Sequence, residues 1–201
     1  MGRNSSGNRG GMIPGDFNFK GRIENIETLK NIKDPKLYRA VANAVSRYHS
    51  VLGVRQKNVK LADMDALVNG VHVTADGKSV AIYLNKDLYK MPYNVVEQQT
   101  KLGYNSGWST RTRKPVAHTV THELAHATWN NKLVGANQRA AGIEIRKLYR
   151  QWSRDKSKTG YGKYSKTNIN EWFAETTTRA VHGDADKYTR GIKDIIRRYK
   201  L

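Results

Sequence analysis

The amino-acid sequence predicts an α+β fold in which a small antiparallel or mixed sheet packs on several helices. Between residues 71 and 85, apolar and polar side chains alternate on either side of Asp76-Gly77, which is the pattern of a β-hairpin with a tight turn. Elsewhere, apolar residues recur every three or four positions, which is the spacing of one helix face. Segments with this helical spacing lie both before and after the hairpin.

The first helix is expected to begin at Asp34-Pro35, because aspartate is a favoured N-cap and proline suits the first helical position. Gly53 should end this helix. Between these limits the apolar face consists of Leu37, Val41, Val45, Tyr48 and Leu52.

A short helix should follow the hairpin, from Pro92 to about Leu102, with Gly103 closing it. Residues 104–114 show no period, and we expect a loop or an irregular strand there. A helix from Pro115 to about Asn131 should come next.

Three segments complete the predicted order. Residues 137–154 form a helix with Ala141, Ile145, Leu148 and Trp152 on one face, and residues 156–166 form a loop. Thr167 or Asn168 caps a helix that ends at Gly183. A last helix is expected within 185–200, on the face that carries Tyr188, Ile192, Ile195 and Tyr199.

The domain organisation follows from length and composition. Residues 1–15 contain five glycines together with Ser, Asn and Arg, which is the composition of a flexible arm. We expect residues 16–201 to form a single domain, since a chain of 201 residues suits one ordinary domain.

Composition excludes several kinds of site. The chain has no cysteine, so it has no disulfide, no thiol nucleophile and no Cys-ligated zinc or iron–sulfur centre. No apolar run approaches the length of a membrane span, and the first 20 residues lack an apolar signal-peptide core. We therefore expect no membrane span, and an intracellular location or packaging in a particle.

His122, Glu123 and His126 form an H-E-x-x-H motif within the helix expected at 115–131. Four residues make slightly more than one helical turn, so both imidazoles project from one face and can bind one cation. Glu123 can then hold the attacking water. The alternative is a surface helix with incidental histidines.

A catalytic zinc needs a third protein ligand. The metzincin pattern is excluded, because Trp129 and Lys132 stand where it requires Gly and His. Glu144 is better interpreted as a surface carboxylate of an amphipathic helix. Glu171 is the stronger candidate, since it lies in the first turn of a later helix and can point toward the histidine pair.

Glu175 follows Glu171 by one helical turn on the same face. In that position a carboxylate can accept the free N–H of a metal-bound imidazole and orient the ring. Alternatively, Arg179 relieves the repulsion between the two carboxylates. Burying both within an aromatic stretch would be costly without a cation, which favours a metal.

Two separated motifs resemble one known family. The HELAH stretch at 122–126 and KYSKTNINEWFAE at 163–175 are similar to the gluzincin metallopeptidase domain of anthrax lethal factor and its relatives, which include the clostridial Pro-Pro endopeptidases. In that family a tyrosine precedes the glutamate ligand by seven residues. An aromatic pair and Ala-Glu follow the ligand. Here those places hold Tyr164, Glu171, Trp172-Phe173 and Ala174-Glu175.

The resemblance implies a zincin-like fold and a zinc-dependent endopeptidase acting on a protein or peptide substrate. It implies Zn²⁺ on His122, His126 and Glu171, with Glu123 as general base. Tyr164 would donate a hydrogen bond to the oxyanion. It also makes residues 79–85 the candidate edge strand for pairing with extended substrate, with a core strand that has no ligand role as the alternative. A small basic domain of this kind would suit a phage or mobile-element gene product.

The other histidines carry no predicted role in catalysis. We interpret His118 as a helix-surface residue, although it lies one turn before His122 and could approach the site. His49 and His72 belong to no constellation. His182, at the C-terminal end of its helix, is interpreted as a residue that the helix dipole favours.

The formal net charge of +19 suggests nucleic acid or another polyanion as a partner. A basic run supports this, although a solvated helix face is the preferred explanation of that run. The alternative function is therefore a basic nucleic-acid-associated or virion structural protein that retains a zincin fold with a structural metal. The run consists of Arg146, Lys147, Arg150, Arg154, Lys156, Lys158, Lys163 and Lys166.

Overall fold

The protein is described here by a computed structural model, which covers residues 23–54, 58–66, 68–75, 78–132 and 136–201. The arm predicted at 1–15 lies outside these ranges. Within them the chain forms a four-stranded sheet and seven α-helices, so the α+β class is confirmed. None of the described helices combines the length and the apolar character needed to cross a bilayer.

The sheet is mixed. Its strands are β1 (Glu24–Thr28), β2 (Val59–Asp63), β3 (Gly70–Ala75) and β4 (Lys78–Asn85), in the spatial order β1-β2-β4-β3. β2 and β4 run parallel, whereas the β1/β2 and β3/β4 pairs are antiparallel. The hairpin prediction is confirmed by the β3/β4 pair, while its predicted turn at 76–77 lies outside the described residues.

The prediction that residues 79–85 form an edge strand is wrong. Residues 82–84 of β4 pair with β2 on one side and with β3 on the other, so both rows of their backbone groups are occupied, whereas residues 78–81 pair with β3 alone. The described strand at this edge of the sheet is β3, the first arm of the hairpin. The parallel β2/β4 pairing makes β4 an inner strand of the sheet. This pairing joins segments about 20 residues apart in the sequence, so local patterning does not reveal it.

Six of the seven described helices follow the predicted order, whereas the short helix α2 was not predicted. They are α1 (Pro35–Leu52), α2 (Lys86–Tyr89), α3 (Tyr93–Asn105), α4 (Pro115–Lys132), α5 (Ala136–Arg154), α6 (Ile169–His182) and α7 (Lys187–Tyr199), with 3-10 turns at Leu29–Asn31 and Tyr164–Lys166. Asp34 caps α1 through its side chain and Gly53 ends it with φ of 74°. Asn168 caps α6 in the same way, and Gly183 ends it.

The end of α3 differs from the prediction. Gly103 does not close the helix but lies buried within it, and a Cβ there would stand 2.8 Å from Ser109 Oγ. The helix continues to Asn105, and the glycine with left-handed backbone is Gly107, at φ of 68°. Gly103 therefore serves close packing of the following loop, a role that sequence spacing does not distinguish from helix termination.

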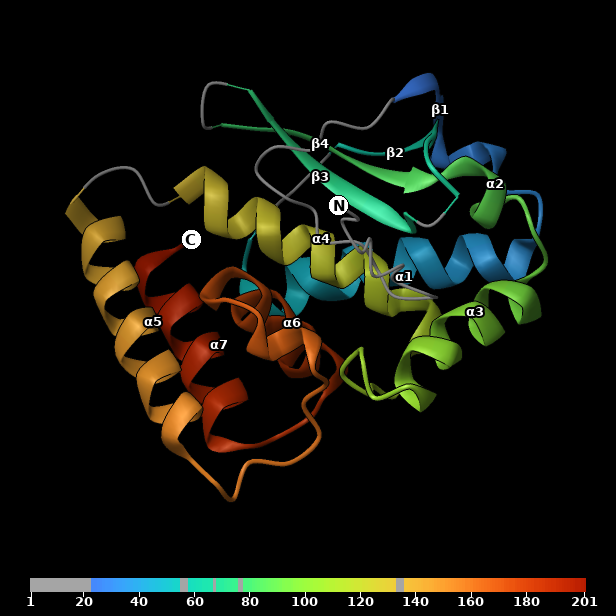
Figure 1. The fold of residues 1–201 in the computed structure, drawn as a ribbon. Helices are drawn as coiled ribbons and strands as arrows, with labels where there is room; N and C mark the ends of the chain where they lie inside the picture. The colour runs from blue at the N-terminus through green and yellow to red at the C-terminus, as the bar shows by residue number, and fades with distance from the viewer. Residues whose placement is uncertain (1–22, 55–57, 67, 76–77, 133–135) are drawn as a thin grey trace, which may run out of the picture.

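Helix α4 lies across the middle of the molecule (Figure 1). β3 and β4 pack on one side of it, and α1 and α6 pack on others, while α5 and α7 pack together against α6. This arrangement joins α4 and α6 along their length, although they are distant in the sequence.

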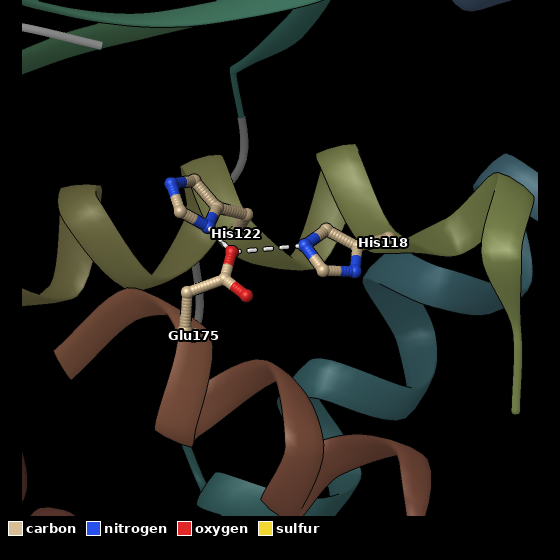
Figure 2. A group of neighbouring side chains, drawn as sticks. All are labelled: His118, His122 and Glu175. Carbon is tan, nitrogen blue, oxygen red and sulfur yellow. Dashed lines mark hydrogen bonds and ion pairs between the residues drawn. The ribbon is translucent and has the colours of Figure 1, made fainter. Parts of the chain in front are cut away.

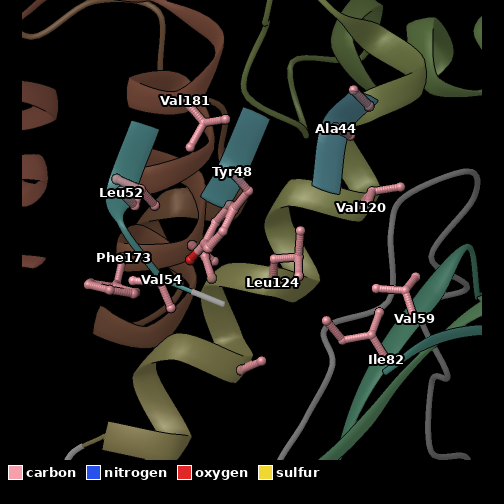
Figure 3. Packing of buried hydrophobic residues seen from close by; sticks show 14 of the residues in the cluster. Ala44, Tyr48, Leu52, Val54, Val59, Ile82, Val120, Leu124, Phe173 and Val181 are labelled. Atoms are coloured by element: carbon pink, nitrogen blue, oxygen red, sulfur yellow. The ribbon is translucent and has the colours of Figure 1, made fainter. Parts of the chain in front are cut away.

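The main hydrophobic core fills the space between α1, α4, α6 and the sheet (Figure 3). Leu124 of α4 is fully buried, and Tyr48 of α1 shares a hydrogen bond of 2.6 Å with Thr128 of α4. Burying a side chain such as Leu124 contributes about 1.5–3 kcal/mol. The core thus fixes the position of the helix that carries the H-E-x-x-H motif.

Candidate metal centre

Helix α4 carries its histidine motif inside the protein. Every residue from 116 to 128 is buried, because the sheet and the helices α1, α3 and α6 cover the faces of α4. His122, Glu123 and His126 are only 1%, 1% and 2% exposed. A surface helix with incidental histidines is therefore excluded.

Helix α6 supplies the two carboxylates. Asn168 accepts hydrogen bonds from the backbone N–H groups of Asn170 and Glu171, which fixes the first turn of the helix. Glu171 and Glu175 then face α4 from successive turns and are 2% and 0% exposed. Their ion pairs within the described residues are all with histidines.

Three donor atoms converge between the two helices. His122 Nε2 lies 3.0 Å from His126 Nε2 and 3.1 Å from Glu171 Oε2, and His126 Nε2 lies 3.3 Å from that same oxygen. Ligands of a tetrahedral zinc at about 2.0–2.1 Å would be separated from one another by about 3.3 Å. The predicted ligand set is therefore brought together with the spacing that one cation requires.

The contact with Glu175 determines which ring nitrogen of His122 carries a proton and which can bind a metal. Its Oε1 lies 2.8 Å from His122 Nδ1, in a short but bent contact, and 3.0 Å from His118 Nε2 (Figure 2). A bare nitrogen lone pair facing a carboxylate oxygen would be repulsive, so Nδ1 carries the proton. Nε2 then faces Glu171 and His126, where a proton or a metal cation would relieve the repulsion between its lone pair and the Glu171 carboxylate.

The pKa values describe a site that attracts positive charge. Burial alone would lower the pKa of His122, but hydrogen bonds and charges from Glu171 and Glu175 raise it well above its usual value. Burial opposes ionisation of Glu171, yet bonds to His122 and His126 lower its pKa to about 2. The pKa of Glu175 is likewise held low, by His118 and His122 against the effect of burial.

Glu123 differs from these two carboxylates. Its pKa is raised, chiefly by burial, and the positive charges of His122 and His126 do not fully offset this effect. Its Oε2 is buried without a hydrogen-bond partner among the described residues. Gly70, at the start of β3, allows the side chains of α4 to lie close to the strand, because a Cβ there would stand 3.4 Å from Glu123 Cγ and 2.8 Å from Thr119 Cγ2. A carboxylate with a raised pKa and a free oxygen suits proton transfer.

Tyr164 lies against the donor group from the loop before α6. Its ring stacks on His122 at 5.5 Å between centroids and on Trp108 at 5.6 Å. Burial, followed by the charge of Glu171, raises its pKa well above the usual value, so the phenol keeps its proton. Its hydroxyl has no hydrogen-bond partner in the described part of the chain.

Two loop segments hold Tyr164 in place. The backbone N–H groups of Lys163 and Tyr164 donate to the carbonyls of Gly107 and Trp108, each at 2.9 Å. A glycine is required at position 162, where the two segments meet, because a Cβ there would overlap the backbone of Trp108 and Ser109. Residues 104–114 were expected to form a loop or an irregular strand. The structure shows a loop beyond Asn105, and this loop positions Tyr164.

His118 is not a surface residue. It is fully buried, donates through Nε2 to Glu175, and contacts Tyr104 through Nδ1 at 3.1 Å. Tyr104 also contacts Thr112, and the N–H of Thr110 donates to Glu175 Oε2 at 3.0 Å. The spacing of His118, His122 and His126 at four-residue intervals was the available signal, since it places all three on one helix face.

His118, His122 and Glu175 form a second group of donor atoms within 4.8 Å of one another. The contacts of Glu175 with the two imidazoles account for this group without a second ion. His122 is shared by both groups, with Nε2 facing one and Nδ1 facing the other. Glu175 therefore orients His122 and is not needed as a ligand.

Other sequence predictions can also be compared with the structure. Arg179 pairs with Asp184 and Asp186 and not with the carboxylates of the site, so it does not relieve their repulsion. Glu144 is confirmed as a surface carboxylate, bound by Arg198 and Tyr199.

Two remaining histidines are buried. His72 of β3 contacts the side chain of Asn130 at 3.2 Å, and its pKa is lowered to about 3, mainly by burial. His182 lies at the end of α6 as expected, but burial lowers its pKa to about 3. It is therefore uncharged at neutral pH, and the interpretation that the helix dipole favours its charge is wrong.

Comparison with family models, with curated proteins and with solved structures gives no match to the chain. The chemical interpretation of the site therefore rests on its own donor atoms and their geometry.

Proposed function

We propose that the protein is a zinc-dependent endopeptidase. One observation supports this most strongly. Three donor atoms of His122, His126 and Glu171 converge at 3.0–3.3 Å, and beside them two buried polar atoms, Glu123 Oε2 and the Tyr164 hydroxyl, have no partner in the described residues. Unpartnered buried polar atoms are costly, and their presence next to a cation site favours a role toward substrate.

The residues would divide the work of peptide hydrolysis as follows. A bound zinc supplies Lewis acidity, which polarises the scissile carbonyl and lowers the pKa of water to about 7. Glu123 accepts a proton from the attacking water and passes it to the leaving amine. Tyr164 keeps its proton and donates a hydrogen bond to the oxygen on which negative charge develops.

The same proposal includes membership of the gluzincin group that lethal factor and the Pro-Pro endopeptidases represent. The observation in its favour is that Tyr164, Glu171 and Glu175, named from the motif alone, all contact His122 or the site around it. The candidate strand for extended substrate is β3 rather than β4, because β3 lies at the edge and packs on α4.

One observation favours the alternative of a structural metal in a basic nucleic-acid-associated or virion protein. His122, His126, Glu171 and Tyr164 are all at most 2% exposed, whereas a hydrolytic site must admit a peptide. A structural metal, however, has no use for a free carboxylate with a raised pKa at Glu123.

The variant Glu123→Gln separates the two functions, because it keeps the size of the side chain but removes its basicity. We expect about one zinc per chain by elemental analysis in the wild type and in this variant. Cleavage of a proteome-derived peptide library should fall by about 10²–10⁴-fold in the variant. Glu144→Gln, a surface carboxylate of α5, is the matched control and should cleave normally. Full cleavage by Glu123→Gln would overturn the proposal, and zinc without any cleavage by the wild type would favour the structural metal.

A further inference from the structure

A cavity of about 560 Å³ lies away from the metal centre, between one face of α1, the first turn of α4 and the end of α6. Four cations line it: Lys36, Arg39 and Arg47 from α1, and Lys114 before α4. Pockets for small ligands commonly enclose about 300–1,000 Å³, so a ligand of nucleotide size would fit.

The cations around this cavity make no close ion pair in the described part of the chain, although Lys36 interacts electrostatically with Asp34 and Glu97. No Asp or Glu lines it, and within the described residues none of the four cations has a carboxylate oxygen within 4.0 Å. The two other cavities described, of about 440 and 280 Å³, both include carboxylates, from Glu144 and Asp194 in one and from Glu97 in the other. The overall excess of basic residues therefore does not make every concave surface purely cationic.

Two of the cations are held in place by uncharged partners. Arg47 donates from Nε to the backbone carbonyl of Val181 at 2.6 Å, which leaves its other N–H groups free. Lys36 lies over the ring of Tyr93, with Nζ 3.9 Å from the centroid. Neither contact cancels the positive charge, so both groups are positioned and available to an anion.

His182 forms part of the wall of this cavity. It lines the same cavity, is 5% exposed, and its Nδ1 has no partner in the described part of the chain. Its Nε2 contacts Thr121 Oγ1 at 3.2 Å, which fixes the ring. Because solvent does not reach Nδ1, the imidazole is a fixed part of the cavity wall and not a ligand-binding group in this conformation.

We propose that this cavity binds an anion that carries a phosphate ester. Arg39 and Lys114 supply exposed cations, Arg47 supplies an oriented guanidinium, and the first turn of α4 adds the partial positive charge of a helix N-terminus. Ala40, Ala44 and Val116 give the cavity an apolar surface for the organic part of the ligand. The phosphate can belong to a free nucleotide or to the backbone of a nucleic acid.

The test compares two variants of equal charge. Arg39→Gln with Lys114→Gln removes two cations from the cavity, and Lys147→Gln with Arg150→Gln removes two exposed cations from α5. None of these four side chains makes a hydrogen bond or an ion pair in the described part of the chain, so both double variants should fold. Binding of adenosine 5′-monophosphate, inorganic phosphate, an eight-nucleotide single strand and adenosine would be measured by calorimetry at low ionic strength, where electrostatic binding is strongest.

We expect at least one phosphate-bearing probe to bind. The cavity pair should weaken that binding at least tenfold, and the α5 pair less than twofold. Binding of the mononucleotide identifies a free nucleotide as the source, whereas binding of the single strand alone identifies nucleic acid. Equal losses in both variants, adenosine binding as tightly as its monophosphate, or no binding by any probe would each overturn the proposal. None of these outcomes depends on peptide cleavage.

Discussion

Replacing Glu175 by Gln tests the geometry of the metal centre most directly. The carboxylate of Glu175 faces three N–H groups, from His122 Nδ1, His118 Nε2 and the backbone of Thr110, at 2.8–3.0 Å. A glutamine has one oxygen and one NH₂ group, so whichever way its amide turns, the NH₂ faces a donor. His122 then loses the partner that keeps its proton on Nδ1 and its Nε2 lone pair directed at Glu171.

The expected loss follows from the role of such partners. Removing the group that orients a metal-bound histidine typically lowers metal affinity by about 10–100-fold, equivalent to about 1.4–2.7 kcal/mol. We expect a value near the upper end, because one residue here contacts both His122 and His118 and is fully buried. Competition for zinc with a chromophoric chelator at constant pH would measure the change.

Glu144→Gln is the control, since it removes a surface carboxylate on α5 and should leave zinc affinity unchanged. Circular dichroism would establish that Glu175→Gln remains folded. A folded variant that binds zinc within twofold of the wild type would refute the assignment of Glu175 as the residue that orients His122.

Three further predictions concern the site and its support. Tyr164→Phe should keep zinc affinity but lower the cleavage rate by about 10²–10³-fold, measured as kcat; an unchanged kcat would exclude Tyr164 as the oxyanion donor. Gly162→Ala should lower the free energy of unfolding in urea by about 1–3 kcal/mol or more, because a Cβ overlaps the backbone of Trp108, whereas Gly53→Ala meets no atom within 4 Å and tests backbone strain alone. In metal-free protein, the lowered pKa of Glu171 contributes stability above its ordinary pKa of 4.5 that is lost as pH falls toward about 2. The stability difference between wild type and Glu171→Gln should therefore shrink by about 3 kcal/mol between these pH values, and a difference that is constant across that range would contradict the ion pairs.

Much of the helical structure could be predicted from capping residues. Asp34 with Pro35, Asn168 and Gly183 all act where the sequence places them, because a cap is a local interaction between a side chain and the nearest backbone groups. The strands β1 and β2 were not predicted. Four of the five residues of β1 are exposed, so this strand carries no alternation, and β2 pairs with a strand distant in the sequence.

The proximity of the proposed histidine ligands could be predicted because their spacing on a helix fixes where they point. Glu171 required a second motif, and Glu175 required the argument that two buried carboxylates need a cation. The spacing of His118 placed it on the face of His122 but did not reveal its burial, because its partners Tyr104 and Glu175 come from separate segments. Gly103 was misread for the same reason, since its role depends on Ser109 in the loop that folds back on it.

The division of the donor set between α4 and α6 also determines when the site can form during synthesis. Glu171 is added 45 residues after His126. At about 5–20 residues per second, the ribosome needs about 2–9 s to make that stretch. Until Glu171 is made, the two histidines lack their carboxylate partner, so a cation that arrives early finds only two of the three proposed ligands. Metal capture and the docking of the last third of the chain are therefore expected to occur as one late event.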